Sequence, residues 1–263
     1  MNDTTANPGA DRREFLTKSG LWLGAAVVGS ALGLVGCSDN AGQTAATAGA
    51  AAKEPGKAGG EKGGEEKEGG ENVSANEDLM REHGLLKRVL IMYDTMADRV
   101  AGGQELNRDV AAQSAGIIRE FVEDYHERIE EKYLFARFLK AGKMTELVNT
   151  LQVQHDRGRT LTSRMLQALK APRPSKADQQ QVVTDMRQFY RMYTPHEARE
   201  DTELYPALHQ LVSRNEYDSM GEEFEKIEHQ KFGQGGFELY LSKVTDLEMK
   251  LGTWDLNQYT PKV

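Results

Sequence analysis

The residues most able to do chemistry are two histidines, each followed four positions later by a glutamate. His126 precedes Glu130, and His196 precedes Glu200. Residues four apart share one face of an α-helix, with Cβ atoms roughly 5–6 Å apart, so each pair can present an imidazole and a carboxylate to one point. A single pair of this kind is usually a hydrogen-bonded surface pair. Imidazole and carboxylate groups together, however, are ligands that suit iron, manganese or zinc.

The two pairs belong to an internal repeat. Residues 126–135 and 196–205 share the pattern H-E-x-x-E-[ED]-x-x-L-[FY]. Upstream of each copy lies a single histidine, His83 or His155, at similar distances of 43 and 41 residues from the paired histidine. This duplication predicts two helical hairpins related by a pseudo-twofold axis. The flanking residues match more weakly, as Glu82-His83-x-x-x-Lys87 and Gln154-His155-x-x-x-Arg159.

Together the two copies supply a symmetric set of four imidazoles and two carboxylates. Such a set suits two metal ions with the carboxylates bridging between them, and the interior of a helical bundle is a known location for such sites. The single cysteine, Cys37, excludes cysteine-rich metal sites and a disulfide within the chain. His209 and His229 lie outside the repeat. The candidate metal ligands are His83, His126, Glu130, His155, His196 and Glu200.

Helices must position these residues. Apolar residues recur at helical spacing and no alternating strand pattern persists, so the sequence predicts helices over 76–100, 107–140, 145–169 and 176–212. We therefore expect an all-α fold, an up-down four-helix bundle over 76–212. The first helix carries apolar residues on one side: Leu79, Leu86, Leu90 and Tyr93.

The last helix of the bundle and the segment after it carry further start and stop signals. Pro195 either kinks the helix or restarts it, with Thr194 and Glu197 forming a capping box. A second capping box, Ser213 to Glu216, opens a C-terminal helical extension over 213–263. The glycines of this extension divide it into two helices: Gly233, Gly235 and Gly236.

Residues 1–37 have the features of an export signal. Arg12-Arg13, followed by Phe15-Leu16 and an apolar run, resembles a twin-arginine signal, and the run is short for a membrane span. The sequence Leu34-Val35-Gly36-Cys37 resembles a bacterial lipobox, in which the cysteine is lipidated. The alternative is an ordinary signal peptide with a chance cysteine.

Residues 38–75 are rich in Ala, Gly, Glu and Lys and contain no aromatic residue. Such a segment buries too little apolar surface to offset its ordering entropy, so we expect a disordered tether. The N-terminal features together predict a protein exported in the folded state and lipid-anchored at the periplasmic or extracytoplasmic face of a bacterial membrane.

Composition limits the partners. The chain has 33 Lys and Arg against 41 Asp and Glu, a formal net charge of −8 and a pI of about 5.4. This balance argues against nucleic-acid binding, which usually requires a basic face. The sequence identifies no protein partner.

The repeated residues resemble the hemerythrin-like, HHE cation-binding family over about 76–212. The resemblance implies an up-down four-helix bundle that holds a non-haem di-iron centre, commonly oxygen-bridged. On the family's pattern, the ligands are His83, His126 with Glu130, His155, and His196 with Glu200. Manganese or zinc are alternatives to iron.

The sequence departs from the family's oxygen carriers, which have a fifth histidine where this chain has Arg159. Asp201 stands at the spacing that the carriers use for their last carboxylate, but Glu200 mirrors Glu130 and is preferred. Glu127 and Glu197 are possible extra ligands, because each adjoins a ligand histidine. Lys87 and Arg159 are either solvated surface charges or cations that hold Glu127, Glu131, Glu197 or Asp201 in place.

These observations favour a di-iron protein that meets oxygen, peroxide or nitric oxide outside the cytoplasm, in sensing or redox protection. The alternatives are reversible oxygen carriage, iron storage or delivery, and a peroxidase-type enzyme. Steady turnover with peroxide and an electron donor would indicate the enzyme, and fast metal release to a chelator without unfolding would indicate storage.

The export signal can be tested by substitution. Replacing Arg12-Arg13 with Lys-Lys should leave precursor in the cytoplasm, because the export receptor reads the paired guanidinium groups. Cys37→Ser should be exported but not anchored, which membrane fractionation detects. Tight membrane retention of the Cys37→Ser protein would contradict a lipid anchor at this residue.

Overall fold

The computed structural model describes residues 73–171 and 175–263. The predicted export signal with Cys37, nearly all of the predicted tether, and residues 172–174 with their two prolines lie outside the described residues. In the remainder of the chain every regular element is a helix, so the predicted all-α class is confirmed.

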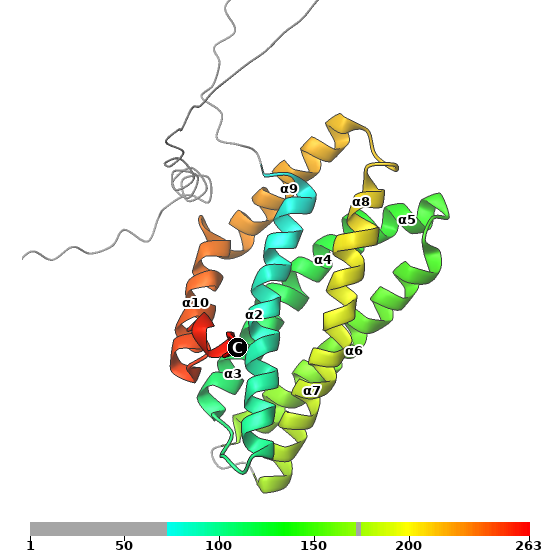
Figure 1. Ribbon diagram of the computed structural model, residues 1–263. Coiled ribbons are helices and arrows are strands. Elements are labelled where there is room, and N and C mark those ends of the chain that lie inside the picture. Colours follow the sequence, from blue (N-terminus) through cyan, green and yellow to red (C-terminus); the bar gives the residue numbers. More distant parts are fainter. Residues whose placement is uncertain (1–72, 172–174) are drawn as a thin grey trace, which may run out of the picture.

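The helices from α2 to α8 form a bundle of four rods (Figure 1). The first rod is α2 (Ala75–Ala101), and the third is α6 (Thr145–Lys170). The fourth joins α7 (Lys176–Arg199), the π-helical segment η4 (Glu200–Leu204) and α8 (Tyr205–Leu208). The second rod is composite: α3 (Arg108–Ile117), π-helical η2 (Ile118–His126), α4 (Glu127–Ile129), π-helical η3 (Glu130–Phe135) and α5 (Ala136–Ala141).

Serine caps begin three of the helices. The Ser74 hydroxyl accepts the Glu77 amide, so α2 begins at Ala75, one residue before its predicted start. Ser175 forms a complete capping box with Asp178. The Ser213 hydroxyl accepts the Glu216 amide as predicted, but the Glu216 side chain accepts from Arg137 instead of returning to its own cap.

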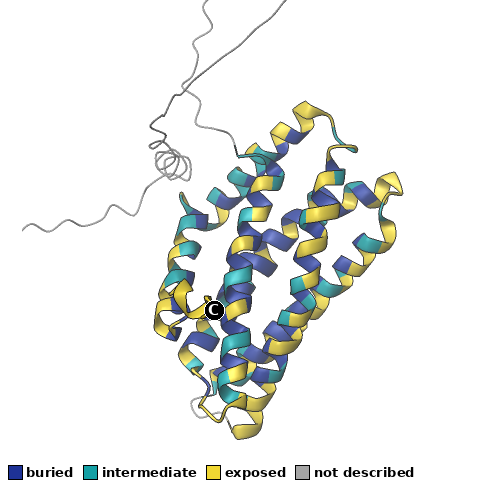
Figure 2. Cartoon of the chain, in the orientation of Figure 1, coloured by how far each residue is buried: buried dark blue, intermediate teal, exposed yellow. Residues whose placement is uncertain are grey.

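The inward faces of the rods form one core (Figure 2). The predicted apolar side of α2 is confirmed, because its four residues are at most 2% exposed. This stripe packs against α7, and α6 packs against α7 and α3. The buried residues of the predicted stripe are Leu79, Leu86, Leu90 and Tyr93.

Pro195 lies within α7, and the helix continues through it without a restart. The predicted capping box at this position is therefore wrong: the Thr194 hydroxyl is buried and makes no hydrogen bond. Packing of the rod against α2 and α6 keeps it continuous, although proline removes one helical hydrogen bond. The rod ends at Leu208, and the predicted end at 212 lies beyond the turn that follows it, over residues 209–211.

The π-helical segments are the main local feature that hydrophobic periodicity did not predict. The wider π turn changes which residues face inward, and such segments often occur at functional sites. The three consecutive residues where η2 meets α4 are buried: Tyr125, His126 and Glu127. The next π segment begins at Glu130, and the one in the fourth rod begins at Glu200.

The C-terminal extension folds back on the bundle. Its helices α9 (Arg214–Phe232) and α10 (Gly236–Leu251) both contact α2, and α10 also contacts α3 (Figure 1). The predicted division at the glycines is confirmed, because the backbone between the two helices is left-handed at Gly235. Among the helices that the structure describes, none combines the length and apolar character that a membrane crossing requires.

Two helical glycines differ in the space around them. A Cβ at Gly158 would lie 2.8 Å from Cε2 of Tyr193, whose ring is stacked on Phe189, whereas a Cβ at Gly84 would meet nothing within 4 Å. We expect Gly158→Ala to lower the free energy of unfolding by about 1–3 kcal/mol through overpacking. Gly84→Ala should raise it by roughly 0.5–1 kcal/mol through helix propensity. Urea unfolding measures both, and equal stabilisation by the two changes would contradict the close packing.

Candidate metal centre

Four buried histidines meet in two pairs in the middle of the bundle. His83 of α2 and His126 of η2 bring their Nε2 atoms within 3.0 Å of each other. His155 of α6 and His196 of α7 do the same at 3.2 Å. When two nitrogens bind the same ion at roughly 2.1 Å and the angle between the two bonds is a right angle, the nitrogens lie about 3.0 Å apart. The spacing within each pair therefore matches two ligands of a single metal ion.

The two glutamates of the repeat connect the histidine pairs. One oxygen of Glu130, Oε2, lies 3.5 Å from Nε2 of His126 and 3.4 Å from Nε2 of His155. Likewise, Oε2 of Glu200 lies 3.5 Å from Nε2 of His83 and 3.1 Å from Nε2 of His196. Each carboxylate thus touches one histidine of each pair, which is the position that a bridging carboxylate must occupy.

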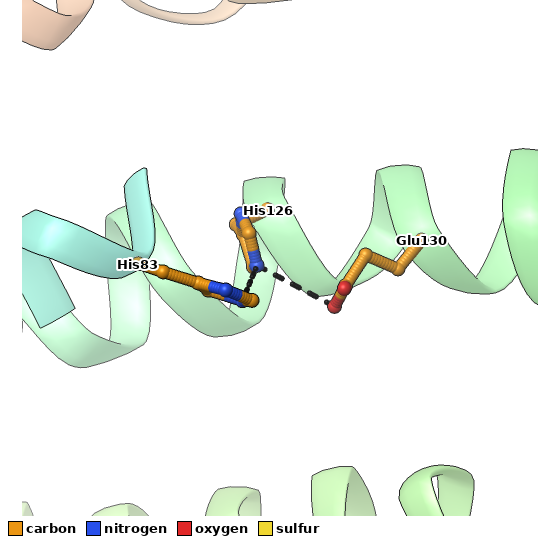
Figure 3. A group of neighbouring side chains, drawn as sticks. All are labelled: His83, His126 and Glu130. Atoms are coloured by element: carbon orange, nitrogen blue, oxygen red, sulfur yellow. Dashed lines mark hydrogen bonds and ion pairs between the residues drawn. The ribbon is translucent and has the colours of Figure 1, made fainter. Parts of the chain in front are cut away.

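The resulting groups are compact enough to hold metal ions. One consists of His83, His126 and Glu130, shown in Figure 3, where the imidazole of His126 lies between the other two side chains. The second consists of His155, His196 and Glu200, with all ligand atoms of each group within 4.8 Å of one another. All six residues are at most 3% exposed.

In each of the four candidate ligand histidines, Nδ1, the ring nitrogen that points out of the site, contacts an acceptor from another helix. Nδ1–H of a metal-binding histidine commonly donates to a carboxylate or carbonyl, which fixes the tautomer and leaves Nε2 for the ion. The four bonds are His83 to Asp201 at 2.8 Å, His126 to Glu82 at 2.7 Å, His155 to Glu131 at 3.2 Å and His196 to Gln154 at 2.9 Å.

The two buried carboxylates need a positive charge nearby, and the residues of the site supply only part of it. Burial raises the pKa of Glu130, and it raises the pKa of Glu200 to about 7. Both oxygens of Glu200 and one of Glu130 are buried without a hydrogen bond, a costly arrangement unless a cation is bound. These unpartnered oxygens, aimed at the histidine nitrogens, show that the residues fit metal ions.

The histidines respond differently to the same burial. Burial lowers the pKa of His126, His155 and His196 to about 4, which keeps these imidazoles neutral and able to bind metal at neutral pH. Burial also disfavours the charged form of His83. There, however, the hydrogen bond to Asp201 and the nearby Glu200 and Glu130 outweigh it and raise the pKa to about 9.

Lys87 and Arg159 pair with the carboxylates beside the ligands. Lys87 forms an ion pair with Glu197, and Arg159 contacts both Glu127 and Glu131 at 2.6 Å. The sequence left open whether Lys87 and Arg159 are solvated surface charges or cations that hold carboxylates in place, and the structure shows the second arrangement. Arg159 also lies near His155, because Glu131 accepts hydrogen bonds from both side chains.

The less central candidates lie around the two groups. Asp201 bonds to the outer nitrogen of His83 and is partly exposed, whereas Glu200 lies inside, which favours Glu200 as the last carboxylate. Glu127 is fully buried and accepts from Tyr193. His209 is exposed beside the ring of Tyr217, and among the described residues neither His209 nor His229 joins a group that could hold a metal.

Sequence reasoning missed Tyr205. Its hydroxyl donates to Glu130 Oε1 at 2.7 Å and lies 3.2 Å from His83 Nε2. Tyr205 is the last residue of the second repeat, and its ring stacks on His83. Phe135, the last residue of the first repeat, stacks on His155 in the same way. The repeat pattern therefore contained a signal for this residue, because both copies carry an aromatic ring at the same position.

The fold and the site define a helical-bundle protein whose buried histidine and glutamate groups could hold metal ions. The chain belongs to the hemerythrin family, because the model of the hemerythrin HHE cation-binding domain matches residues 74–208. Two similar proteins, one from Mycobacterium bovis and one from Mycobacterium tuberculosis, are both described as uncharacterized. Each is 44% identical over 190 residues, which cover 72% of this chain and 74% of the relative. No solved structure matches the chain significantly.

Proposed function

We propose that this chain is an exported, membrane-tethered hemerythrin-like protein whose non-haem di-iron centre reacts with oxygen, peroxide or nitric oxide in sensing or redox protection. One observation carries the dinuclear part of the proposal: each buried carboxylate contacts one histidine from each pair. A mononuclear site would need no such arrangement. The export and anchoring part rests on the residues of the N-terminal segment alone.

The chain's own residues support a resident metal centre. The ligands His83 and His126, Glu130, His155, and His196 and Glu200 would hold the two ions, and iron bound there would supply one-electron redox chemistry. Tyr205 donates to Oε1 of Glu130, whereas Oε2 lies beside the nitrogens of His126 and His155. The near-complete burial of the ligands supports slow metal exchange and disfavours rapid storage and release.

Metal content tests the dinuclear proposal. Well-loaded wild-type protein should hold two metal ions per chain, and metal removal should lower its melting temperature, because binding stabilises only the folded state. Glu130→Ala should lose most of both ions, since its carboxylate serves both histidine pairs. His209→Ala, at an exposed position, is the control and should keep the wild-type content. One ion per chain in loaded wild-type protein would exclude a dinuclear centre.

Reactivity with oxygen tests the proposed chemistry. The guanidinium of Arg159 and the carboxylates Glu127 and Glu131 form a polar, charged edge beside His155. Protons and water near the centre favour electron transfer to oxygen with release of superoxide or peroxide over reversible binding. We therefore expect the reduced protein to lose its ferrous state within minutes in air, and degassing not to restore it.

Substitution at Arg159 sharpens this test in stopped-flow spectroscopy. Arg159→His should slow the oxidation if the new imidazole reaches the metal, whereas Arg159→Lys keeps the cation and should oxidise as fast as the wild type. A wild-type spectrum that changes in oxygen and reverts when oxygen is removed would instead indicate an oxygen carrier.

A further inference from the structure

The pseudo-twofold symmetry of the centre is broken at the acceptors of the outer histidine nitrogens. Nδ1 of His126 donates to the carboxylate of Glu82 at 2.7 Å, whereas Nδ1 of the equivalent His196 donates to the amide oxygen of Gln154 at 2.9 Å. Glu82 and Gln154 occupy the same place in the repeat, directly before the single histidine of each half. The geometry is nearly conserved, but one acceptor is charged and the other is neutral.

The second pair of outer acceptors differs in the same direction. Asp201 accepts from His83 at 2.8 Å, and Glu131 accepts from His155 at the longer distance of 3.2 Å. Glu131 also accepts from Arg159 at 2.6 Å and from Arg128 at 2.7 Å. Two guanidinium groups therefore compete with His155 for this carboxylate, which weakens its effect on the imidazole.

A negatively charged acceptor on Nδ1 makes the imidazole more basic and strengthens the bond that Nε2 forms to a metal. We propose that the two metal positions are inequivalent and that Glu82 is the positioning residue that makes the His83–His126 position the tighter one. This inference rests on the proposed function, because it requires a dinuclear centre.

The C-terminal extension lies behind the same half of the site. The Tyr125 hydroxyl donates to Glu82 Oε1 at 3.0 Å and lies 3.5 Å from Glu228 Oε2 of α9. The other oxygen of Glu228 accepts the amide of Phe237 near the start of α10, at 3.0 Å. The carboxylate that orients His126 is thus held by a hydroxyl that the extension helps to position.

The test is a calorimetric titration of the metal-free protein with Co²⁺ at neutral pH. The wild type should bind two ions in steps whose dissociation constants differ by about 10–100-fold, the usual effect of an outer hydrogen-bond partner. Glu82→Gln gives the two halves the same amide acceptor and should weaken only the tighter step, by about the same factor. A purely structural role of Glu82 would weaken both steps.

The reciprocal variant keeps the test decisive even if Glu82→Gln folds poorly. Gln154→Glu should tighten the weaker step and bring the two constants together. Glu77→Gln removes the same charge at an exposed position of α2 and should leave both steps unchanged. Two equal steps in the wild type, or no effect of Gln154→Glu, would overturn the inequivalence while leaving the dinuclear centre intact. Fewer than two bound Co²⁺ ions would contradict the proposed function itself.

Discussion

Two carboxylates buried in contact with four imidazoles are the constraint on which the rest of the site depends. Glu130 and Glu200 are fully buried, and burial raises the pKa of both. A bundle core that holds two such groups must compensate them with cations or hydrogen bonds. The structure supplies part of this compensation through Tyr205 and His83, and Oε2 of each carboxylate faces histidine nitrogens of both pairs.

The helices are adapted to this constraint. Consecutive residues at the site are buried in both of the rods that carry the repeat: His126 with Glu127, and His196 with Glu197. In the second rod one π-helical segment ends at His126 and a second begins at Glu130, and such segments often occur at functional sites. Because α7 packs against α2 and α6, the fourth rod continues through Pro195. His196 and Glu200 therefore remain on one continuous element.

The sequence predicted what depends on local spacing. The duplicated His-x-x-x-Glu pairs, the helices and the apolar side of α2 all follow from residues a few positions apart, and the single histidines follow from the matched spacing of the two copies. The partners on the outer nitrogens could not be predicted in this way. Asp201 meets His83 across 118 residues and Glu82 meets His126 across 44, so the pairing exists only once the rods are packed. The π turns were missed because apolar periodicity does not distinguish a locally widened helix from a regular one.

A duplicated site need not be a symmetric one. In the proposed dinuclear centre the repeat fixes the inner residues, because each half would present two imidazoles and one carboxylate to a metal. The outer residues are under no such restriction, and here they differ. Glu82 of the first half corresponds to Gln154 of the second, and Tyr205 of the second copy of the repeat corresponds to Phe135 of the first. Glu82 supplies a charged acceptor and Tyr205 supplies a hydroxyl on the side of His83 and His126, which is also the side that α9 and α10 cover. The extension therefore supports the half of the centre in which the acceptors are most strongly charged.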